Sequence, residues 1–401
     1  MSLPTPVAGP PRSIGSLLRL SLLRMTFPDA IPARGRSVRS TISSSGELRL
    51  ELAEREVRAP RESEVLVAVE ASPINPSDLG VLLGAVDPGT LRPDGTALVG
   101  RVSESSLPLY RDRFDTPLAV GNEGAGTVIA AGAGAARLIG RRVALVGGSM
   151  WADYRVIDAA AVVELPDSVS TVQGAALFVN PLTALSMVET MRAEGYTALV
   201  HTAAASNLGQ MLVRICAADG IGLVNVVRRA EQAQALRDIG AVYVVDSSQA
   251  DFADQLSEAI RATGATIAFD AVGGGTLAGD ILTAMERAQP PLTAYTPYGT
   301  TVRKQVYIYG SLDFSPTVIE RRFGLTWSVG GYLLTNAMVR LGGEIVSRMR
   351  DRVLAEATTT FASRYTKTIG LDDILDPDVI AAAARRGTGA KYLLDPSRDR
   401  P

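Results

Sequence analysis

The hydrophobic pattern over residues 177–311 alternates between short apolar runs and longer segments whose apolar residues recur every three or four positions. The first pattern is typical of buried strands and the second of amphipathic helices. Strands are predicted at 197–202, 223–227, 242–245, 266–270 and 305–309, and helices at 177–194, from 208 to about 219, and at 233–239, 252–263 and 277–288. This alternation predicts a doubly wound parallel sheet of the Rossmann type, with ligands at the carboxyl ends of its strands.

Upstream of this region the pattern is that of strands with few helices. Strands are predicted at 48–52, 65–70, 127–131, 141–146 and 152–157. At the other end of the chain, a helix over 377–386 with Asp376 as its N-cap and a last strand at 392–394 are predicted. The sequence thus indicates an α/β protein with a parallel-sheet domain and a β-rich domain.

Residues 197–229 combine a strand, a tight turn, a helix and a second strand, as dinucleotide-binding units do. Ala204, Ser206 and Gly209 occupy the three positions of a G-x-G-x-x-G fingerprint, so only the third glycine is present. Alanine and serine still let the backbone approach a pyrophosphate at a helix N-terminus. We expect this turn, with Asn207 and Leu208, to hold one. A βαβ unit without a ligand remains the alternative for so loose a motif.

Two arginines follow the second strand of this unit. Arg228 and Arg229 lie about 20 residues beyond the turn, where an NAD site carries an acidic residue. Planar guanidinium groups suit a 2′-phosphate, which they bind in a bidentate manner. The pair therefore predicts NADP(H), and a solvated pair of charges at a strand end is the alternative.

Two long connections and one aromatic stretch allow more than one interpretation. Residues 84–118 exceed the usual length of a connection, which favours a lid or binding insertion. We expect that segment and residues 289–304 to shape the substrate pocket. The aromatic residues of 322–334 are interpreted as core, with a cofactor wall as the alternative. The two prolines around Asn75 predict a rigid loop that holds Asn75 and Ser77 at a cleft, with Asp78 capping the next helix.

Composition narrows the classes of function. The 401 residues carry a net charge of −2, so no basic excess points to nucleic acid. One Cys and one His are too few for the usual zinc sites, and we predict no metal. No apolar run is long enough to span a membrane. Residues 1–36 are expected to be a disordered extension. The predicted compartment is the cytoplasm, or the mitochondrion if this extension is a transit peptide.

Four motifs are familiar together: residues 73–78 (PINPSD), 121–124 (GNEG), 179–184 (VNPLTA) and 225–228 (NVVR). With them, the chain from about 37 to 395 resembles the medium-chain dehydrogenase/reductase superfamily. The match is best to its zinc-free branch of quinone reductases and 2-enoyl thioester reductases. Zinc alcohol dehydrogenases of that superfamily have Cys near Asn75 and His at Asn122, and both positions are Asn here.

This resemblance implies a division of the chain and roles for single residues. It implies a GroES-like catalytic domain at 37–178 and 345–401 and a Rossmann NADP(H) domain at 179–344. Asn180 and Thr183 would lie beside the nicotinamide, and Lys391 would contact the cofactor. The implied nicotinamide-side residues are Tyr309, Gly310, Ser311, Leu312 and Trp327 within 326–328. The implied pyrophosphate and 2′-phosphate residues are Ser206, Asn207, Leu208, Gly209, Arg228 and Arg229.

One position departs from the enoyl reductases, which have an essential tyrosine where this chain has Val86. Tyr110 could substitute for it as a proton donor, although a packed loop tyrosine is the alternative. Because a hydroquinone can take its proton from water, the sequence favours a quinone or enone as acceptor. The expected polar wall comprises Asn75, Asn122, Thr183 and Trp151, with Asn75, Thr183 and Tyr110 as catalytic candidates.

The predicted function is therefore a zinc-independent, NADPH-dependent oxidoreductase that acts on a small molecule and forms a homodimer. One alternative is a 2-enoyl thioester reductase. A second, from another class, is a catalytically idle NADPH-binding sensor or scaffold.

Overall fold

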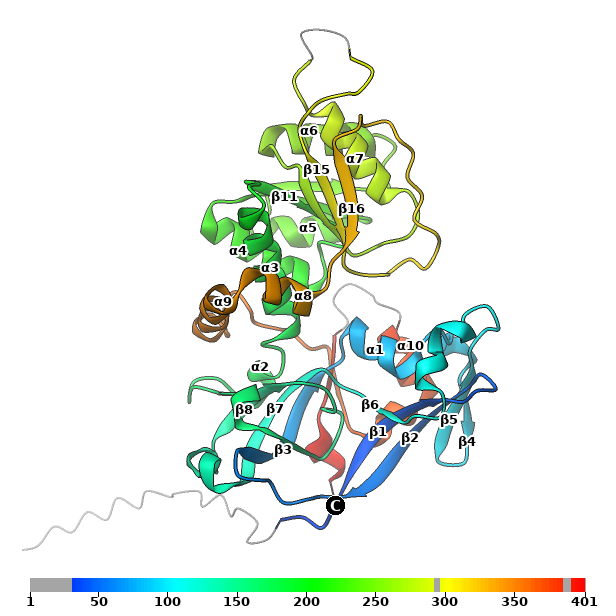
Figure 1. Ribbon diagram of the computed structural model, residues 1–401, viewed down its shortest axis with the longest axis vertical. Helices are drawn as coiled ribbons and strands as arrows, with labels where there is room; N and C mark the ends of the chain where they lie inside the picture. Colours follow the sequence, from blue (N-terminus) through cyan, green and yellow to red (C-terminus); the bar gives the residue numbers. More distant parts are fainter. Residues whose placement is uncertain (1–30, 292–295, 385–390, 401) are drawn as a thin grey trace, which may run out of the picture.

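The computed structural model describes residues 31–291, 296–384 and 391–400. They form two domains stacked along the long axis of the molecule, the upper one built on a parallel sheet and the lower one mostly of antiparallel strands (Figure 1). The chain starts in the lower domain, builds the upper one and returns, so its last strand lies in the lower domain. Within these residues no helix is long and apolar enough to cross a membrane.

The upper domain confirms the predicted doubly wound sheet. Its strands in the described chain follow the order β13-β12-β11-β14-β15-β16, and every neighbouring pair is parallel. Their bounds are β11 (Ala198–His201), β12 (Gly222–Val227), β13 (Tyr243–Asp246), β14 (Ile267–Asp270), β15 (Lys304–Ile308) and β16 (Trp327–Gly331). Successive strands are added on one side of β11 up to β13 and then on its other side from β14 onward. Such folds bind ligands at this point, between β11 and β14.

Helices cover both faces of this sheet, as its apolar strands require. The bounds on one face are α3 (Val179–Ala193), α4 (Asn207–Asp219), α5 (Ala230–Arg237) and α8 (Leu334–Leu341), and on the other α6 (Phe252–Thr263) and α7 (Leu277–Arg287). Leu256 and Ile260 of α6 are almost fully buried against Val224 and Val226 of β12. Each such side chain contributes roughly 1.5–3 kcal/mol of burial free energy.

The lower domain consists of two sheets. One has the order β4-β5-β2-β1-β6 and the other β10-β8-β7-β3-β18-β17, with β9 also paired to β3. The bounds are β1 (Arg34–Ile42), β2 (Glu47–Glu56), β3 (Glu64–Pro73), β4 (Arg92–Asp94), β5 (Ala97–Arg101), β6 (Leu118–Ala119), β7 (Glu123–Ala131), β8 (Arg142–Val146), β9 (Tyr154–Asp158), β10 (Val162–Glu164), β17 (Lys367–Ile369) and β18 (Tyr392–Leu394). Helix α1 (Pro76–Leu83) follows β3 and packs against β1, whereas helix α2 (Thr171–Gly174) packs against β3, β7 and β8.

The interpretation of residues 84–118 as a lid was wrong. This segment contributes β4, β5 and β6 to the first sheet, and β5 pairs with β2 from Leu98 to Arg101. Leu98 and Val99 are 1% and 2% exposed, so the segment builds core. The predicted extension also ends early, since β1 begins at Arg34, while residues 1–30 lie outside the described residues.

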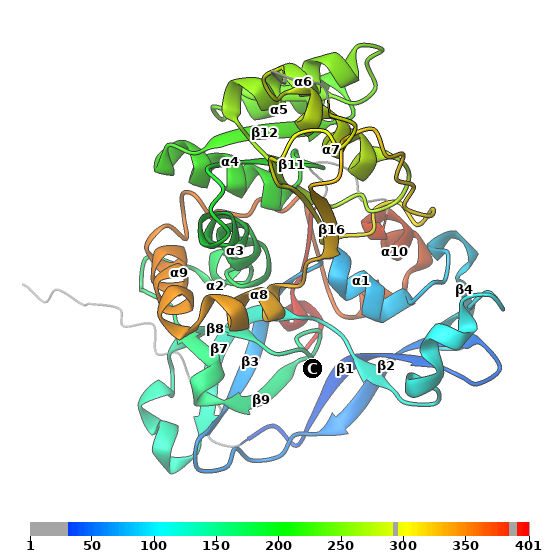
Figure 2. The same ribbon diagram turned by 45° about the horizontal axis from the view of Figure 1, so that its top comes forward.

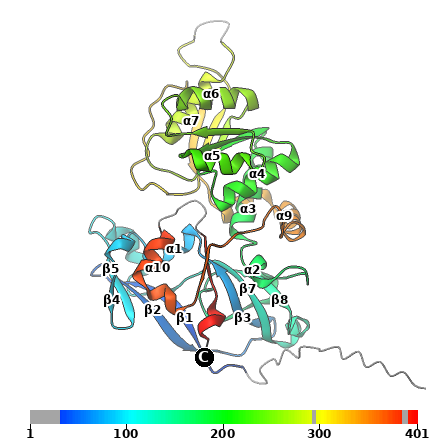
Figure 3. The same ribbon diagram turned by 180° about the vertical axis from the view of Figure 1, so that it is seen from behind.

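The chain crosses between the domains twice. It rises from α2 into α3, and it returns after α9 (Gly343–Ala355), which packs against α3 and α8 (Figures 2 and 3). It then forms β17, α10 (Pro377–Ala384) and β18. Helix α10 begins where predicted, with the N–H of Asp378 bonded to the Asp376 carboxylate at 2.8 Å. Its predicted last residues, 385–386, lie outside the described residues.

The aromatic stretch 322–334 contains an unpredicted strand, β16. Phe323 is fully buried and stacks edge-on against Trp327 at 5.1 Å, which agrees with the interpretation as core. Trp327 is the first residue of β16 and pairs with Lys304 at the start of β15. It therefore lies at the amino edge of the sheet, opposite the ligand-binding edge, and the predicted cofactor role of Trp327 does not fit its position.

Candidate active site

The predicted phosphate turn lies between β11 and α4. Ser206 is the N-cap of α4, and its Oγ accepts the N–H of Gly209 at 3.1 Å. A Cβ at Gly209 would lie 2.0 Å from the carbonyl oxygen of Ala204, so only glycine fits there. The N–H groups of Asn207 and Leu208 make no hydrogen bond within the described chain. Unpaired N–H groups at a helix N-terminus suit an anion, so this turn fits a pyrophosphate.

The two arginines begin directly after the last residue of β12, Val227. Both side chains are exposed. Arg229 pairs with Glu231 at 3.2 Å, whereas Arg228 has no ion pair among the described residues. The backbone N–H of Arg228 donates to the side chain of Gln232 at 3.1 Å, which fixes the start of the loop. Arg228 is therefore the better placed of the two for a phosphate group.

A buried histidine supports the carboxyl edge of the sheet. His201, the last residue of β11, is fully buried, and its Nε2 lies 2.8 Å from the hydroxyl of Tyr309. Burial lowers the pKa of His201 to about 3, so its imidazole stays neutral. Beside it, Thr202 donates to the Asp270 carboxylate at 2.7 Å and joins the ends of β11 and β14. These bonds connect the carboxyl ends of β11 and β14 and the segment that follows β15.

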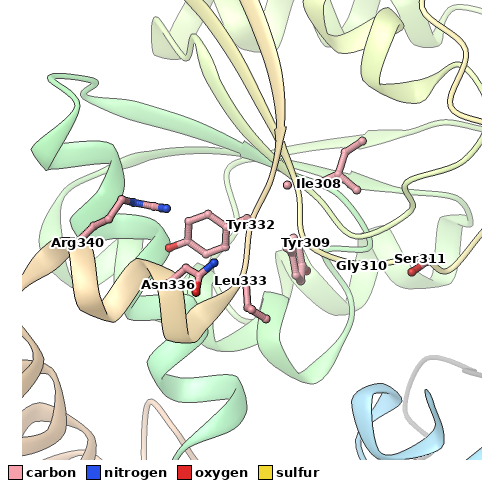
Figure 4. Close-up of a pocket in the computed structure, with 9 residues that line it drawn as sticks. Ile308, Tyr309, Gly310, Ser311, Tyr332, Leu333, Asn336 and Arg340 are labelled. Carbon is pink, nitrogen blue, oxygen red and sulfur yellow. The ribbon is translucent and has the colours of Figure 1, made fainter. Parts of the chain in front are cut away.

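A pocket of about 470 Å³ opens where β15 and β16 end (Figure 4). Tyr309, Gly310 and Ser311, which the sequence assigned to the nicotinamide side, line it together. Its other lining residues are Ile308, Gly331, Tyr332, Leu333, Asn336 and Arg340. Asn336 and Arg340 come from α8 and were not predicted. Because the preceding strand, β16, was not recognised in the sequence, the position of α8 relative to the sheet could not be inferred. The only sequence feature that links these two residues is their spacing of four positions, which places them on the same face of a helix.

In the lower domain, the loop predicted around Asn75 leads directly into helix α1. Asn75 is the N-cap of α1 and is 1% exposed, whereas Asp78, predicted to cap, is the third residue of the helix. The Asp78 carboxylate accepts the backbone N–H groups of Asn75 and Asn122, both at 2.8 Å. Burial raises the pKa of Asp78 to about 7. One buried carboxylate thus holds both asparagine loops.

Glu123 brings the lower domain and α3 together. This fully buried carboxylate accepts the side-chain amide of Asn75 at 2.9 Å and the N–H groups of Phe178 and Val179, also at 2.9 Å. Asn180 Nδ2 in turn donates to Asn75 Oδ1 at 3.4 Å. The sequence analysis quoted Glu123 inside a motif but gave it no role. The sequence feature that could have indicated a role for Glu123 is an acidic residue at the start of an apolar strand.

Lys391 lies beside this cluster. Its Nζ is buried and has no hydrogen-bond partner within the described chain. Burial lowers the pKa of Lys391, and the charges of Glu123 and Asp78 oppose that shift. The ammonium also lies 5.7 Å from the ring centre of Tyr365. An unpaired buried cation beside the predicted nicotinamide residues fits a cofactor that carries negative charge.

Three further expected members of the site have the following surroundings. Tyr110 is half-buried and packs against the lower-domain core, where a Cβ on Gly84 would be 3.2 Å from its ring. Its role as a proton donor stays a prediction. Trp151 is 0% exposed and therefore belongs to the core rather than to a polar wall. Thr183 donates its hydroxyl to Val179 of its own helix, at 2.5 Å.

Packing contacts also describe Val86, the position of the enoyl reductase tyrosine, and the insertion at residues 289–304. Val86 is 5% exposed and faces Gly100, whose Cβ would lie 2.7 Å from a Val86 methyl group. Residues 296–304 of the insertion 289–304 precede β15 and meet α7 through Thr300 and Glu286 at the amino edge of the sheet. The residues around Thr300 thus lie at the edge of the sheet opposite the one expected to bind ligands, whereas residues 292–295 of this insertion lie outside the described residues.

Comparison with known proteins gives two family matches. Residues 61–167 match the alcohol dehydrogenase GroES-like domain, and residues 208–308 match the zinc-binding dehydrogenase family. A mitochondrial enoyl-acyl-carrier-protein reductase of Xenopus tropicalis is 30% identical over 47% of this chain and 50% of its own length. A quinone oxidoreductase of Pseudomonas aeruginosa is 29% identical over 40% of this chain and 50% of its own length. The matches thus span about half the length of these relatives.

Solved structures extend the likeness over most of the chain. A candidate NADPH:quinone reductase from Mesorhizobium loti superposes with a TM-score of 0.68 and 28% identity, covering 92% of this chain and 100% of that one. The parallel sheet and the loop motifs of this chain agree with these matches. The chain belongs to the medium-chain dehydrogenase/reductase superfamily. Within it, the relatives are quinone oxidoreductases and enoyl reductases of the zinc-free type. The described residues contain no group of three or more His, Cys, Asp or Glu arranged for a metal ion.

Proposed function

We propose that this protein is an NADPH-dependent oxidoreductase that transfers hydride to a quinone or an α,β-unsaturated carbonyl compound, without a metal. The observation that carries the proposal is the phosphate turn followed by Arg228, an exposed guanidinium with no ion pair in the described chain. The similarity to NADPH:quinone reductases supports the same cofactor. Bound NADPH would supply the hydride, and the residues of this chain would bind and orient the reactants.

Each cofactor residue has a specific contribution. The N–H groups of Asn207 and Leu208, with Ser206 and Gly209 shaping the turn, would hold the pyrophosphate. Arg228, assisted by Arg229, would bind the 2′-phosphate. Residues 309–312 and Asn180 would border the nicotinamide, with Lys391 supplying a positive charge nearby.

The acceptor would lie against Asn122 and Asn180, which can donate hydrogen bonds to a carbonyl oxygen as negative charge develops on it. Asn75, which is buried, would act from behind them by accepting Asn180 Nδ2. Asn122 Nδ2 at present donates to Ser77 at 2.9 Å, so this wall is polar and already organised. Tyr110, the candidate substitute for the tyrosine absent at Val86, is half-buried and packs against the lower-domain core. A quinone, whose reduced form takes its protons from water, therefore fits this wall better than an enoyl thioester.

The decisive experiment is NADPH oxidation with a panel of quinones, enones and an enoyl thioester. We expect turnover with at least one quinone or enone and slower turnover with the thioester. A preference for the thioester would favour the enoyl reductase alternative, which similarity to five enoyl-acyl-carrier-protein reductases supports. Tight NADPH binding without turnover on any acceptor would favour the sensor or scaffold.

We further propose a homodimer that forms through β16. This strand ends the parallel sheet in the described chain, so one of its edges is unpaired. Exposed apolar side chains flank both ends of the strand: Tyr298 (65% exposed), Leu325 (64%), Leu333 (59%) and Val339 (82%). Antiparallel pairing of two β16 strands about a twofold axis would cover these side chains.

The division into a catalytic domain at 37–178 and 345–401 and an NADP(H) domain at 179–344 remains our proposal, with the first boundary moved to Arg34 by β1. The cytoplasm remains the predicted compartment, with the mitochondrion as the alternative. Fractionation of cells producing the full chain would decide between them.

A further inference from the structure

Glu123 is a fully buried carboxylate for which neither cofactor binding nor acceptor binding accounts. It accepts three hydrogen bonds of 2.9 Å, from the side chain of Asn75 and from the N–H groups of Phe178 and Val179. Burying a charge is costly unless it is well paired, so this arrangement needs a compensating gain. Its donors lie in the loop before α1 and at the start of α3, the two elements that carry Asn75 and Asn180.

The network imposes a direction on both amides. A carboxylate only accepts hydrogen bonds, so Asn75 must turn its NH₂ group toward Glu123. The Oδ1 atom of Asn75 then faces away, and it accepts Asn180 Nδ2 at 3.4 Å. The hydrogen-bond partners therefore define which end of each amide points where.

Burial raises the pKa of Glu123, whereas the charge of Lys391 and the three hydrogen bonds favour its ionised form. Lys391 and Asp78 lie within electrostatic range of the carboxylate. Lys391 Nζ makes no hydrogen bond in the described chain, so it offsets negative charge without displacing Asn75. Asp78 is occupied by the backbone N–H groups of Asn75 and Asn122.

We propose that Glu123 is a positioning residue that orients the Asn75 amide and, through it, fixes the donor direction of the Asn180 amide beside the acceptor. This inference rests on the proposed hydride transfer. Glutamine has the same shape, but its oxygen would serve the two backbone donors while its NH₂ faced Asn75. Asn75 would then have to rotate by half a turn, and Asn180 with it.

The first test compares E123Q with the wild type and with E70Q as a matched control. Glu70 is also a carboxylate on the β3–β7 pair, but it bonds only Thr127 in the described chain, at 2.6 Å. We expect E123Q to lower kcat by about 100-fold, the size found for losing one preorganised donor, with KM and the Kd of NADPH changed by less than about threefold. E70Q should keep the wild-type kcat. Wild-type kcat in E123Q would overturn the proposal.

A double variant separates positioning from folding. N75D together with E123Q moves the carboxylate from position 123 to position 75. There it accepts both the NH₂ group of the introduced glutamine and the NH₂ group of Asn180. The Asn180 direction is thus restored, and we expect about a tenfold gain in kcat over E123Q alone. Loss of kcat with a matching loss of thermal stability, and no gain in the double variant, would assign Glu123 a purely structural role.

A last readout needs no turnover. In protein labelled with ¹⁵N-asparagine, the side-chain NH₂ signals of Asn180 should shift in E123Q and return in the double variant. If the wild type transfers no hydride, the proposed function fails, while these signals still decide whether Glu123 sets the amide direction. Unchanged Asn180 signals in E123Q would overturn the inference even if activity fell.

Discussion

At the scale of single residues, burial decides the chemistry of His201. The folded pKa of His201 is about 3, against 6.5 for an exposed histidine. A base with a lowered folded pKa binds protons only when the chain unfolds, so its stability contribution is complete above about pH 6.5 and is lost as the pH falls toward 3. His201 is the only histidine in the chain, which makes its titration separable.

We therefore predict a pH-dependent difference between the wild type and His201→Gln. Between about pH 7.5 and about pH 5.5, the wild type should lose roughly 1.4 kcal/mol more unfolding free energy than the variant. Urea denaturation at the two pH values measures this. Parallel losses in both proteins would mean that His201 is protonated in the folded state.

Arg228 offers the residue-scale test of cofactor choice. Arg228→Asp removes the guanidinium and restores the acidic residue of NAD sites, so the ratio of kcat/KM for NADPH to that for NADH should fall by at least about tenfold. Arg237→Asp on α5, also at an exposed position, is the control and should leave the ratio unchanged. An unchanged ratio in Arg228→Asp would refute our interpretation of the arginine pair.

At the scale of elements, the strand–turn–helix unit was predictable because its pattern is local. The predicted strand 197–202 and helix from 208 correspond to β11 and α4. Strand β16 was missed because its glycines and aromatic residues do not form an apolar run, and only its parallel pairing with β15 makes it a strand. Strand β5 was missed because its partner β2 is distant in sequence, and β4 was missed because it forms only by pairing with β5.

The phosphate turn also contains backbone strain that can be measured. Ala203 has a φ of +49°, a left-handed conformation that costs an L-residue about 1 kcal/mol relative to glycine. Ala203→Gly should thus raise the unfolding free energy by roughly 0.5–1 kcal/mol. Ala205→Gly, in the same turn but without positive φ, should lower it. Equal effects from both variants would show that the conformation of Ala203 carries no strain.

At the scale of the whole molecule, the edge of β16 predicts assembly. Leu325→Asp and Leu333→Asp place charge on opposite ends of the proposed interface, and both should convert the dimer to a monomer in light scattering after size exclusion. Leu109→Asp, at a site 80% exposed in the lower domain, should leave the dimer intact. A wild-type monomer at micromolar concentration, or dimers in all three variants, would exclude this interface.

The sequence alone determined the doubly wound sheet, the phosphate turn, the arginine pair and the superfamily. Each of these features depends on residues close together in the sequence. They are recognised from hydrophobic periodicity, from a turn at a helix start, or from a short motif. Cofactor identity and the roles of the predicted residues remain predictions, although Ser206 and Arg228 lie where a dinucleotide would need them.

The tertiary structure decided what depends on contacts between distant segments. It packed Val86 and Trp151 into the core and left Tyr110 half-buried against it, because apolar burial outweighs the polar tip of a tryptophan. It also gathered Asn75, Glu123 and Asn180 from three separate stretches into one hydrogen-bonded cluster. No local pattern encodes such a cluster, since its stability comes from mutual burial and pairing in the folded chain.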